Sequence, residues 1–146
     1  MSGKQVLDMS GATEDFFSDT AMIGIGSAMP GYRFCWAVNR EFDFDFIREP
    51  EYDLEYKPAK DQVHYFSFYQ FEVPYSSSKH LLYQLRSEKK ALLPEIKQLD
   101  YLWLICSPTA DIEAREITDE LRNLPEIQLA QIIPPDRLKN LNHLII

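Results

Sequence analysis

The chain has 146 residues, of which 45% are hydrophobic and 13% aromatic, and its formal net charge at pH 7 is −8. This size and aromatic content fit one domain with a substantial buried core, and they exclude a chain that is disordered throughout. The negative charge disfavours nucleic acid and anionic lipid as partners, and no segment reaches the roughly 20 apolar residues that a membrane span requires.

The first part of the chain predicts short strands and one buried helix. We expect strands at 5–8 and 20–27; the second of these, TAMIGIGS, is apolar and also suits a buried turn. Pro30 stands where a helix can begin, so GYRFCWAVNRE predicts a buried helix over 31–41. A strand is the alternative for this segment, because Tyr, Phe, Trp and Val favour sheets.

The stretch EFDFDF, residues 41–46, alternates acidic and aromatic side chains. We expect a strand here, because successive side chains of a strand point to opposite faces. The rings would then face the core and the acids would face water. The following segment, REPEYDLEYK, is interpreted as a polar loop or an irregular edge strand.

The second half of the chain predicts a hairpin and then a strand–helix–strand unit. VHYFSFYQFEV (63–73) and HLLYQLRSE (80–88) are the expected arms of the hairpin, and QLDYLWLICS (98–107) is the expected central strand. A helix with one apolar stripe should run from Pro108 to about Leu124.

The last predicted strand, IQLAQII (127–133), should lie parallel to the central strand, because the helix between them forms a right-handed crossover. A short helical tail at 136–142 follows. The predicted fold class is therefore α+β: a single domain with a mixed, mainly antiparallel sheet, a C-terminal β-α-β unit, and helices packed on the sheet.

The segment LPEIKQLDY, Leu93 to Tyr101, leads into the central strand. Pro94 has no N–H group and suits a position just before a strand. In an extended strand Asp100 shares a face with apolar side chains, so its carboxylate needs donors such as backbone N–H groups, Arg33 or Arg86. Tyr101 can bury its ring and keep its hydroxyl group hydrogen-bonded.

This segment resembles the motif that names the bacterial IPExxxVDY family. Pro94, Glu95, Asp100 and Tyr101 match that motif, and Leu93 and Leu99 stand where the family has Ile and Val. The earlier stretch MIGIGSAMPGYRFCWAVNRE is also similar to the family's pattern. The resemblance implies a small cytoplasmic bacterial protein. It supplies no catalytic residues, because no activity is assigned to the family.

Two interpretations of the motif stay open at this point. In the structural one, its polar residues fix how the central strand enters the sheet. In the functional one, they form the polar floor of a small-ligand pocket, or a pair of catalytic carboxylates among them performs acid–base chemistry. The candidate residues for this pocket or strand-entry cluster are Glu95, Asp100, Tyr101 and Arg33.

The remaining motifs predict no catalytic residue, cofactor or metal. His64, His80 and His143 have no metal-ligand spacing and are expected on the surface or in a hairpin. Cys35 and Cys106 are far apart in sequence, and the N-terminus lacks a signal-like apolar core, so we expect free structural thiols in a reducing cytoplasm.

Residues 41–61 contain eight acids and three bases, and therefore contribute −5 of the net charge of −8. The acidic and aromatic surface of 41–56 is an ordinary solvated face over a phenylalanine core, or a docking face for a basic or aromatic-accepting partner. Our first functional hypothesis is a non-enzymatic protein-interaction or scaffold module that also forms a homodimer through an exposed sheet edge. The second is a small-molecule binder or enzyme. The candidate interaction face comprises Glu41, Asp43, Asp45, Glu51, Asp53 and Glu55.

Overall fold

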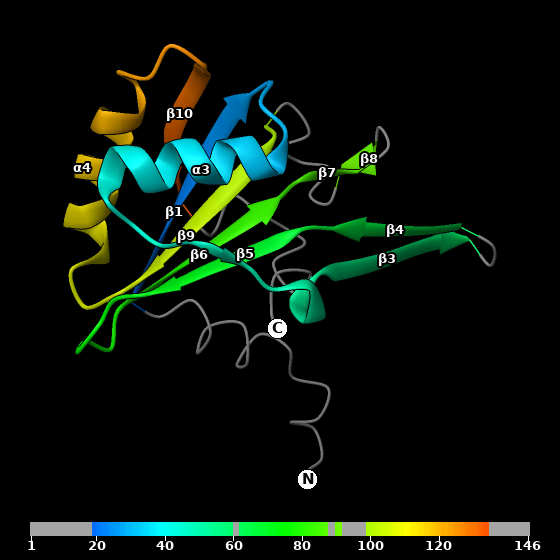
Figure 1. Ribbon diagram of the computed structural model, residues 1–146, viewed down its shortest axis with the longest axis horizontal. Coiled ribbons are helices and arrows are strands. Elements are labelled where there is room, and N and C mark those ends of the chain that lie inside the picture. The colour runs from blue at the N-terminus through cyan, green and yellow to red at the C-terminus, as the bar shows by residue number, and fades with distance from the viewer. Residues whose placement is uncertain (1–18, 60–61, 88–89, 92–98, 135–146) are drawn as a thin grey trace, which may run out of the picture.

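The computed structural model describes residues 19–59, 62–87, 90–91 and 99–134. Within these residues the predicted α+β class is confirmed: helices pack on a mainly antiparallel six-stranded sheet (Figure 1). The predicted strand at 5–8 and the predicted tail at 136–142 lie outside the described residues. The helical elements of the described residues are α3 (Gly31–Phe42), α4 (Ala110–Leu121) and the 3-10 turn η1 (Pro50–Tyr52).

The six-stranded sheet has the order β10-β1-β9-β6-β5-β2, and every neighbouring pair in it is antiparallel. Its strands are β1 (Thr20–Ser27), β2 (Ile47–Arg48), β5 (Phe68–Glu72), β6 (Lys79–Gln84), β9 (Tyr101–Cys106) and β10 (Ile127–Ile133). Two further two-stranded sheets pair β3 (Leu54–Ala59) with β4 (Gln62–Phe66), and β7 (Arg86–Ser87) with β8 (Lys90–Ala91).

The predicted central strand is confirmed as β9, which pairs with β1 on one side and β6 on the other. Strands β9 and β10 are parallel, as predicted for the β9-α4-β10 unit, although β1 lies between them and is antiparallel to both. The predicted hairpin is confirmed as β5 and β6. Its first arm is shorter than predicted, because the chain leaves one sheet at Ser67 and enters another, so that β4 and β5 are separate strands.

The strand predicted for EFDFDF is wrong. Helix α3 continues through Phe42, and Asp43 ends it in the left-handed region with φ of 57°. The side chain of Asn39 then holds Phe46 by accepting from its N–H (2.8 Å) and donating to its carbonyl (3.1 Å). The rings nevertheless pack on the core and the acids are exposed, so the alternation of burial is as predicted while the backbone is a helix end and a loop.

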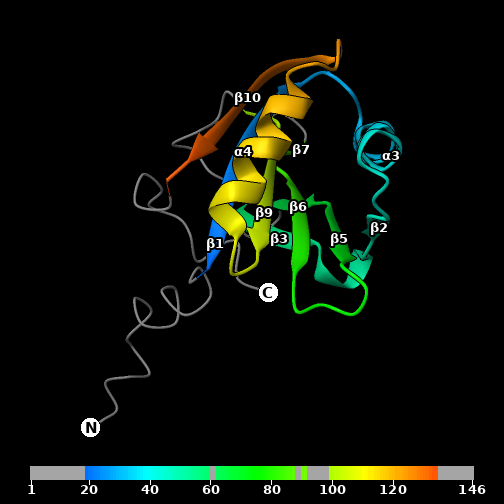
Figure 2. The ribbon, with the colours of Figure 1, turned by 90° about the vertical axis from the view of Figure 1, so that its left-hand side faces the viewer.

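Buried side chains form one cluster on each face of the sheet. Tyr101, Trp103 and Ile105 point into the first cluster, whereas Leu102 and Leu104 point into the second, which confirms the expectation that β9 is apolar on both faces. The buried side chains of α3 and α4 all belong to the first cluster or lie beside it, so both helices cover the same face (Figure 2).

Candidate functional site

Asp100 lies directly before β9, and both of its carboxylate oxygens are engaged. Oδ2 accepts a hydrogen bond from the backbone N–H of Ser27 at 2.9 Å, and Oδ1 pairs with Nε of Arg86 at 3.0 Å. Of the two arginines that the sequence proposed as donors, Arg86 is therefore the partner, while Arg33 is exposed on α3. The backbone of Asp100 also bonds to Ile25 and Leu85, which joins β1 to the chain beyond β6.

Tyr101 follows with its ring in the first cluster. The ring stacks on Phe34 of α3, with centroids 4.1 Å apart and planes 6° apart, and the hydroxyl group donates to the carbonyl oxygen of Met29 at 2.6 Å. Burial raises the pKa of Tyr101 above that of a free tyrosine, and neighbouring Tyr69 and Asp100 raise it further. The hydroxyl group therefore stays protonated at neutral pH and serves as a donor.

Asp100 and Tyr101 together fix the connection between β1 and α3. Ser27 adds to this clamp, because its hydroxyl group donates to the carbonyl of Glu126 at 2.9 Å and accepts from the N–H of Met29 at 3.2 Å. The described residues Asp100 and Tyr101 of the motif thus meet Ser27 and Met29 of the earlier stretch in one cluster. Its polar groups bond to each other, which favours the structural interpretation of the motif. Glu95 lies outside the described residues.

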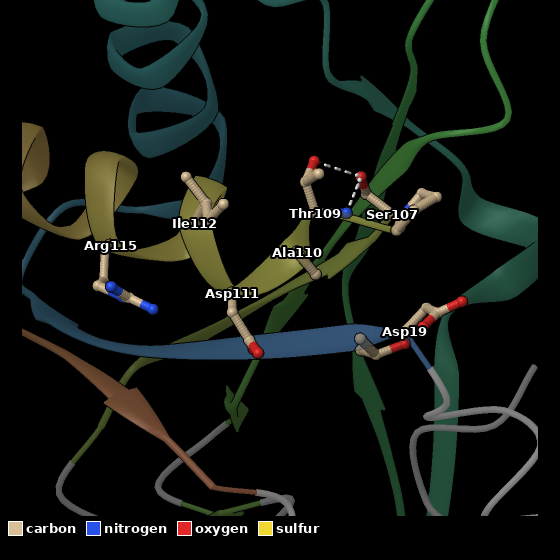
Figure 3. Close-up of a pocket in the computed structure, with 9 residues that line it drawn as sticks. Asp19, Ser107, Thr109, Ala110, Asp111, Ile112 and Arg115 are labelled. Atoms are coloured by element: carbon tan, nitrogen blue, oxygen red, sulfur yellow. Dashed lines mark hydrogen bonds between the residues drawn. The ribbon is translucent and has the colours of Figure 1, made fainter.

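A cleft of about 440 Å³ opens at the start of α4, and its lining includes Asp19, Asp111 and Arg115 (Figure 3). The hydroxyl groups of Ser107 and Thr109 both donate to Oε2 of Glu113 at 2.6 Å. The carboxylate of Glu113, from the first turn of α4, therefore already lies at the start of this helix. With two further aspartates at its edge, this cleft disfavours an anionic ligand despite the positive end of the helix dipole.

A second open groove, of about 430 Å³, lies where the end of α3 meets α4. Its floor is apolar and its rim carries four carboxylates. A protonated Glu120 can donate a hydrogen bond to the carboxylate of Glu41, which raises the pKa of Glu120, as do desolvation and the negative charge of Glu41. The residues that line this acidic groove are Glu41, Phe42, Phe44, Glu113, Glu116, Ile117 and Glu120.

The residues of the candidate interaction face do not all lie together in the structure. Glu41 joins the acidic groove, whereas Asp43, Asp45, Glu51 and Glu55 are exposed elsewhere on 43–55. Asp53 is partly buried and already bonded within the protein: it forms a two-pronged ion pair with Arg48, 2.6 Å for each bond, and accepts from the N–H of Phe68.

Sequence reasoning missed the three glutamates that α4 contributes to the groove. Their signal was available, because Glu113, Glu116 and Glu120 are spaced by three and four residues and such positions share one face of a helix.

His80 lies on β6 in the β5–β6 hairpin, which is one of the two positions that we expected for a histidine, and its side chain is buried. It lies among Phe44, Phe71 and Trp103, and its Nδ1 accepts from Nε1 of Trp103 at 3.0 Å. Burial lowers the pKa of His80 to about 4, against a smaller opposing effect of Glu113, so the ring is neutral with its proton on Nε2. The side chains of His64 and His143 lie outside the described part.

Cys35 and Cys106 are both free thiols, as the sequence predicted. Burial raises the pKa of Cys35 to about 11, assisted by the charge of Asp45, and burial also raises the pKa of Cys106. Neither thiol has the lowered pKa of a reactive cysteine. Among the described residues, no group of three or more His, Cys, Asp and Glu side chains could hold a metal ion.

No family model matches this chain, and no curated protein matches it either. In the part of the chain that the structure describes, no helix is long and apolar enough to cross a membrane.

Proposed function

We propose that this protein is a non-enzymatic, cytoplasmic interaction module that binds a basic segment of another protein in the acidic groove between α3 and α4. The observation that carries this proposal is the combination of an apolar floor with a rim of four glutamates. A lysine or arginine side chain has the same two parts, since its methylene stem packs on apolar surface while its charge reaches acids.

The arrangement of the rim supports a cationic partner. Glu41 and Glu120 come from different helices and are close enough to share a hydrogen bond, which raises the pKa of Glu120. A positive charge between them would relieve their repulsion. Glu113 is held in place by the hydroxyl groups of Ser107 and Thr109, so part of the rim is ordered before any partner binds.

The alternative, a small-molecule binder or enzyme with a pocket near the start of β9, has less support. The carboxylate of Asp100 and the hydroxyl group of Tyr101 are both occupied within the protein. Arg33 does not join them, and Glu95 is outside the described residues. We also propose membership of the IPExxxVDY family, which rests on the motif residues and carries no activity with it.

The test uses a defined probe, a short peptide that alternates lysine with leucine, labelled for fluorescence anisotropy. We expect binding that weakens at least tenfold in the double variant Glu116→Gln/Glu120→Gln. The control variant Glu51→Gln/Glu72→Gln removes the same charge from exposed positions away from the groove and should bind like the wild type. Equal losses in both variants would show nonspecific attraction to an acidic protein and would refute the groove as the site.

A further inference from the structure

The outer face of α3 carries an exposed row of Tyr32, Trp36 and Arg40, which we call the α3 row. These residues are four positions apart, about one helical turn each, and lie opposite the buried Phe34 and Val38. Tyr32 is 76% exposed and Trp36 is 60% exposed. Large aromatic side chains and arginine are the residues that most often dominate binding at protein interfaces.

The row is ordered and accessible. The guanidinium carbon of Arg40 lies 5.4 Å from the ring centroid of Trp36, a cation–π contact within the helix. Figure 2 shows α3 nearly end-on at the margin of the molecule, with no described element beyond its outer side. A partner can therefore approach Trp36 without displacing any described element.

We propose that the occupant of this face is a second copy of the chain, bound with the two α3 helices antiparallel across a two-fold axis at Trp36. Tyr32 and Arg40 lie at equal distances, four residues each, on either side of Trp36. A two-fold axis at Trp36 therefore places each Arg40 against the partner's Tyr32. The guanidinium group would be held between Trp36 of its own chain and that tyrosine ring, so the row is its own complement.

The β10 edge of the six-stranded sheet fits a dimer less well than the α3 row. At this edge, Nε of Arg122 donates to the carbonyl of Ala130 at 3.1 Å. A side chain thus already covers a backbone acceptor that a second strand would use. The α3 row is also separate from the acidic groove, so the dimer does not depend on the proposed function.

The experiment is sedimentation equilibrium of the full chain at 150 mM salt, where the Debye length of about 8 Å limits repulsion between two acidic copies. One helix face is small beside the ~800 Å² per partner of a standard interface, so we expect a dimer with a dissociation constant of about 10–100 µM. Trp36→Ala should weaken it at least tenfold, whereas Tyr75→Ala, which truncates an exposed aromatic in a loop, should leave it unchanged.

A pair of complementary substitutions tests the antiparallel arrangement. Tyr32→Arg places two arginines against each other across the axis, and Arg40→Glu places a carboxylate against a ring, so each variant should weaken the dimer about tenfold or more. The double variant Tyr32→Arg/Arg40→Glu pairs arginine with glutamate and should restore it. A chain that stays monomeric at 500 µM would overturn the proposal, as would a double variant no better than either single one.

Discussion

The hydroxyl group of Tyr101 donates to the carbonyl oxygen of Met29, 2.6 Å away, although the two residues are 72 positions apart in the chain. Tyr101→Phe keeps the stacked ring and removes this bond, leaving the carbonyl of Met29 without that donor. We expect the free energy of unfolding to fall by about 1–2 kcal/mol, measured by urea denaturation. An unchanged midpoint and slope would show that water replaces the hydroxyl group at no cost.

Asp100 should act as a structural residue with two separable contacts. Asp100→Asn keeps an oxygen that can accept from Ser27 but loses the charge opposite Arg86, which is 44% exposed, so we expect a loss below about 1 kcal/mol. Asp100→Ala loses both contacts and should cost about 2 kcal/mol. Thermal unfolding of both variants, with Arg86→Ala as the control for the ion pair, measures the difference. Equal losses for Asn and Ala would assign the whole effect to the charge.

His80 should make the protein less stable in mild acid. Its pKa is lowered from 6.5 to about 4, so as the pH falls below 6.5 the unfolded chain takes up a proton that the folded protein excludes. The free energy of unfolding should therefore fall between pH 6.5 and 4, by about 3 kcal/mol from this group.

The measurement is denaturation of the wild type and of His80→Gln at intervals from pH 7 to pH 4. Glutamine offers an acceptor to Trp103 but does not titrate. The difference in the free energy of unfolding between the wild type and the variant should therefore shrink as the pH falls. A constant difference between the two proteins would contradict a lowered pKa for His80.

Cys35 should react slowly in the folded protein. With its pKa raised to about 11, the reactive thiolate fraction at pH 8 is on the order of 100-fold smaller than for an ordinary cysteine. Labelling of the Cys106→Ala variant with a disulfide reagent, folded and in urea, isolates this thiol. Rates that are equal in the two states would show that the site opens faster than the reagent reacts.

Asp43→Gly should stabilise the protein. Asp43 ends α3 with φ of 57°, a conformation that glycine adopts without the steric cost of a Cβ atom. We expect a gain of about 0.5–1 kcal/mol in the free energy of unfolding. Asp45→Gly, a control at a nearby exposed position without positive φ, should not stabilise.

The sequence predicted those elements whose pattern was long and regular. The continuous apolar run from Tyr101 to Cys106 identified the central strand, and the spaced apolar positions of 110–121 identified α4. EFDFDF failed because alternation over six residues does not separate a strand from a helix end followed by a loop. The left-handed Asp43 and the side chain of Asn39 decide that segment.

The candidate sites were harder to predict, because they depend on which elements become neighbours. A carboxylate in need of donors was predicted at Asp100, and one of its two proposed arginines, Arg86, is the partner. The acidic groove combines Glu41 with residues more than 70 positions later, and no local pattern signals that meeting. Trp36 lay inside a segment read as wholly buried, so its exposure appeared once α3 was placed.

The position of β1 also bears on how the chain folds. This strand pairs with β9 and β10, so its partners, such as Ile133 for Met22, are among the last described residues to be synthesised. Contacts between segments that are distant in sequence require the closure of long loops, and this makes folding slower. The apolar strand β1 must therefore wait for most of the chain before it is covered, and we expect rapid formation of the β5–β6 hairpin to precede a slow, rate-limiting insertion of β1.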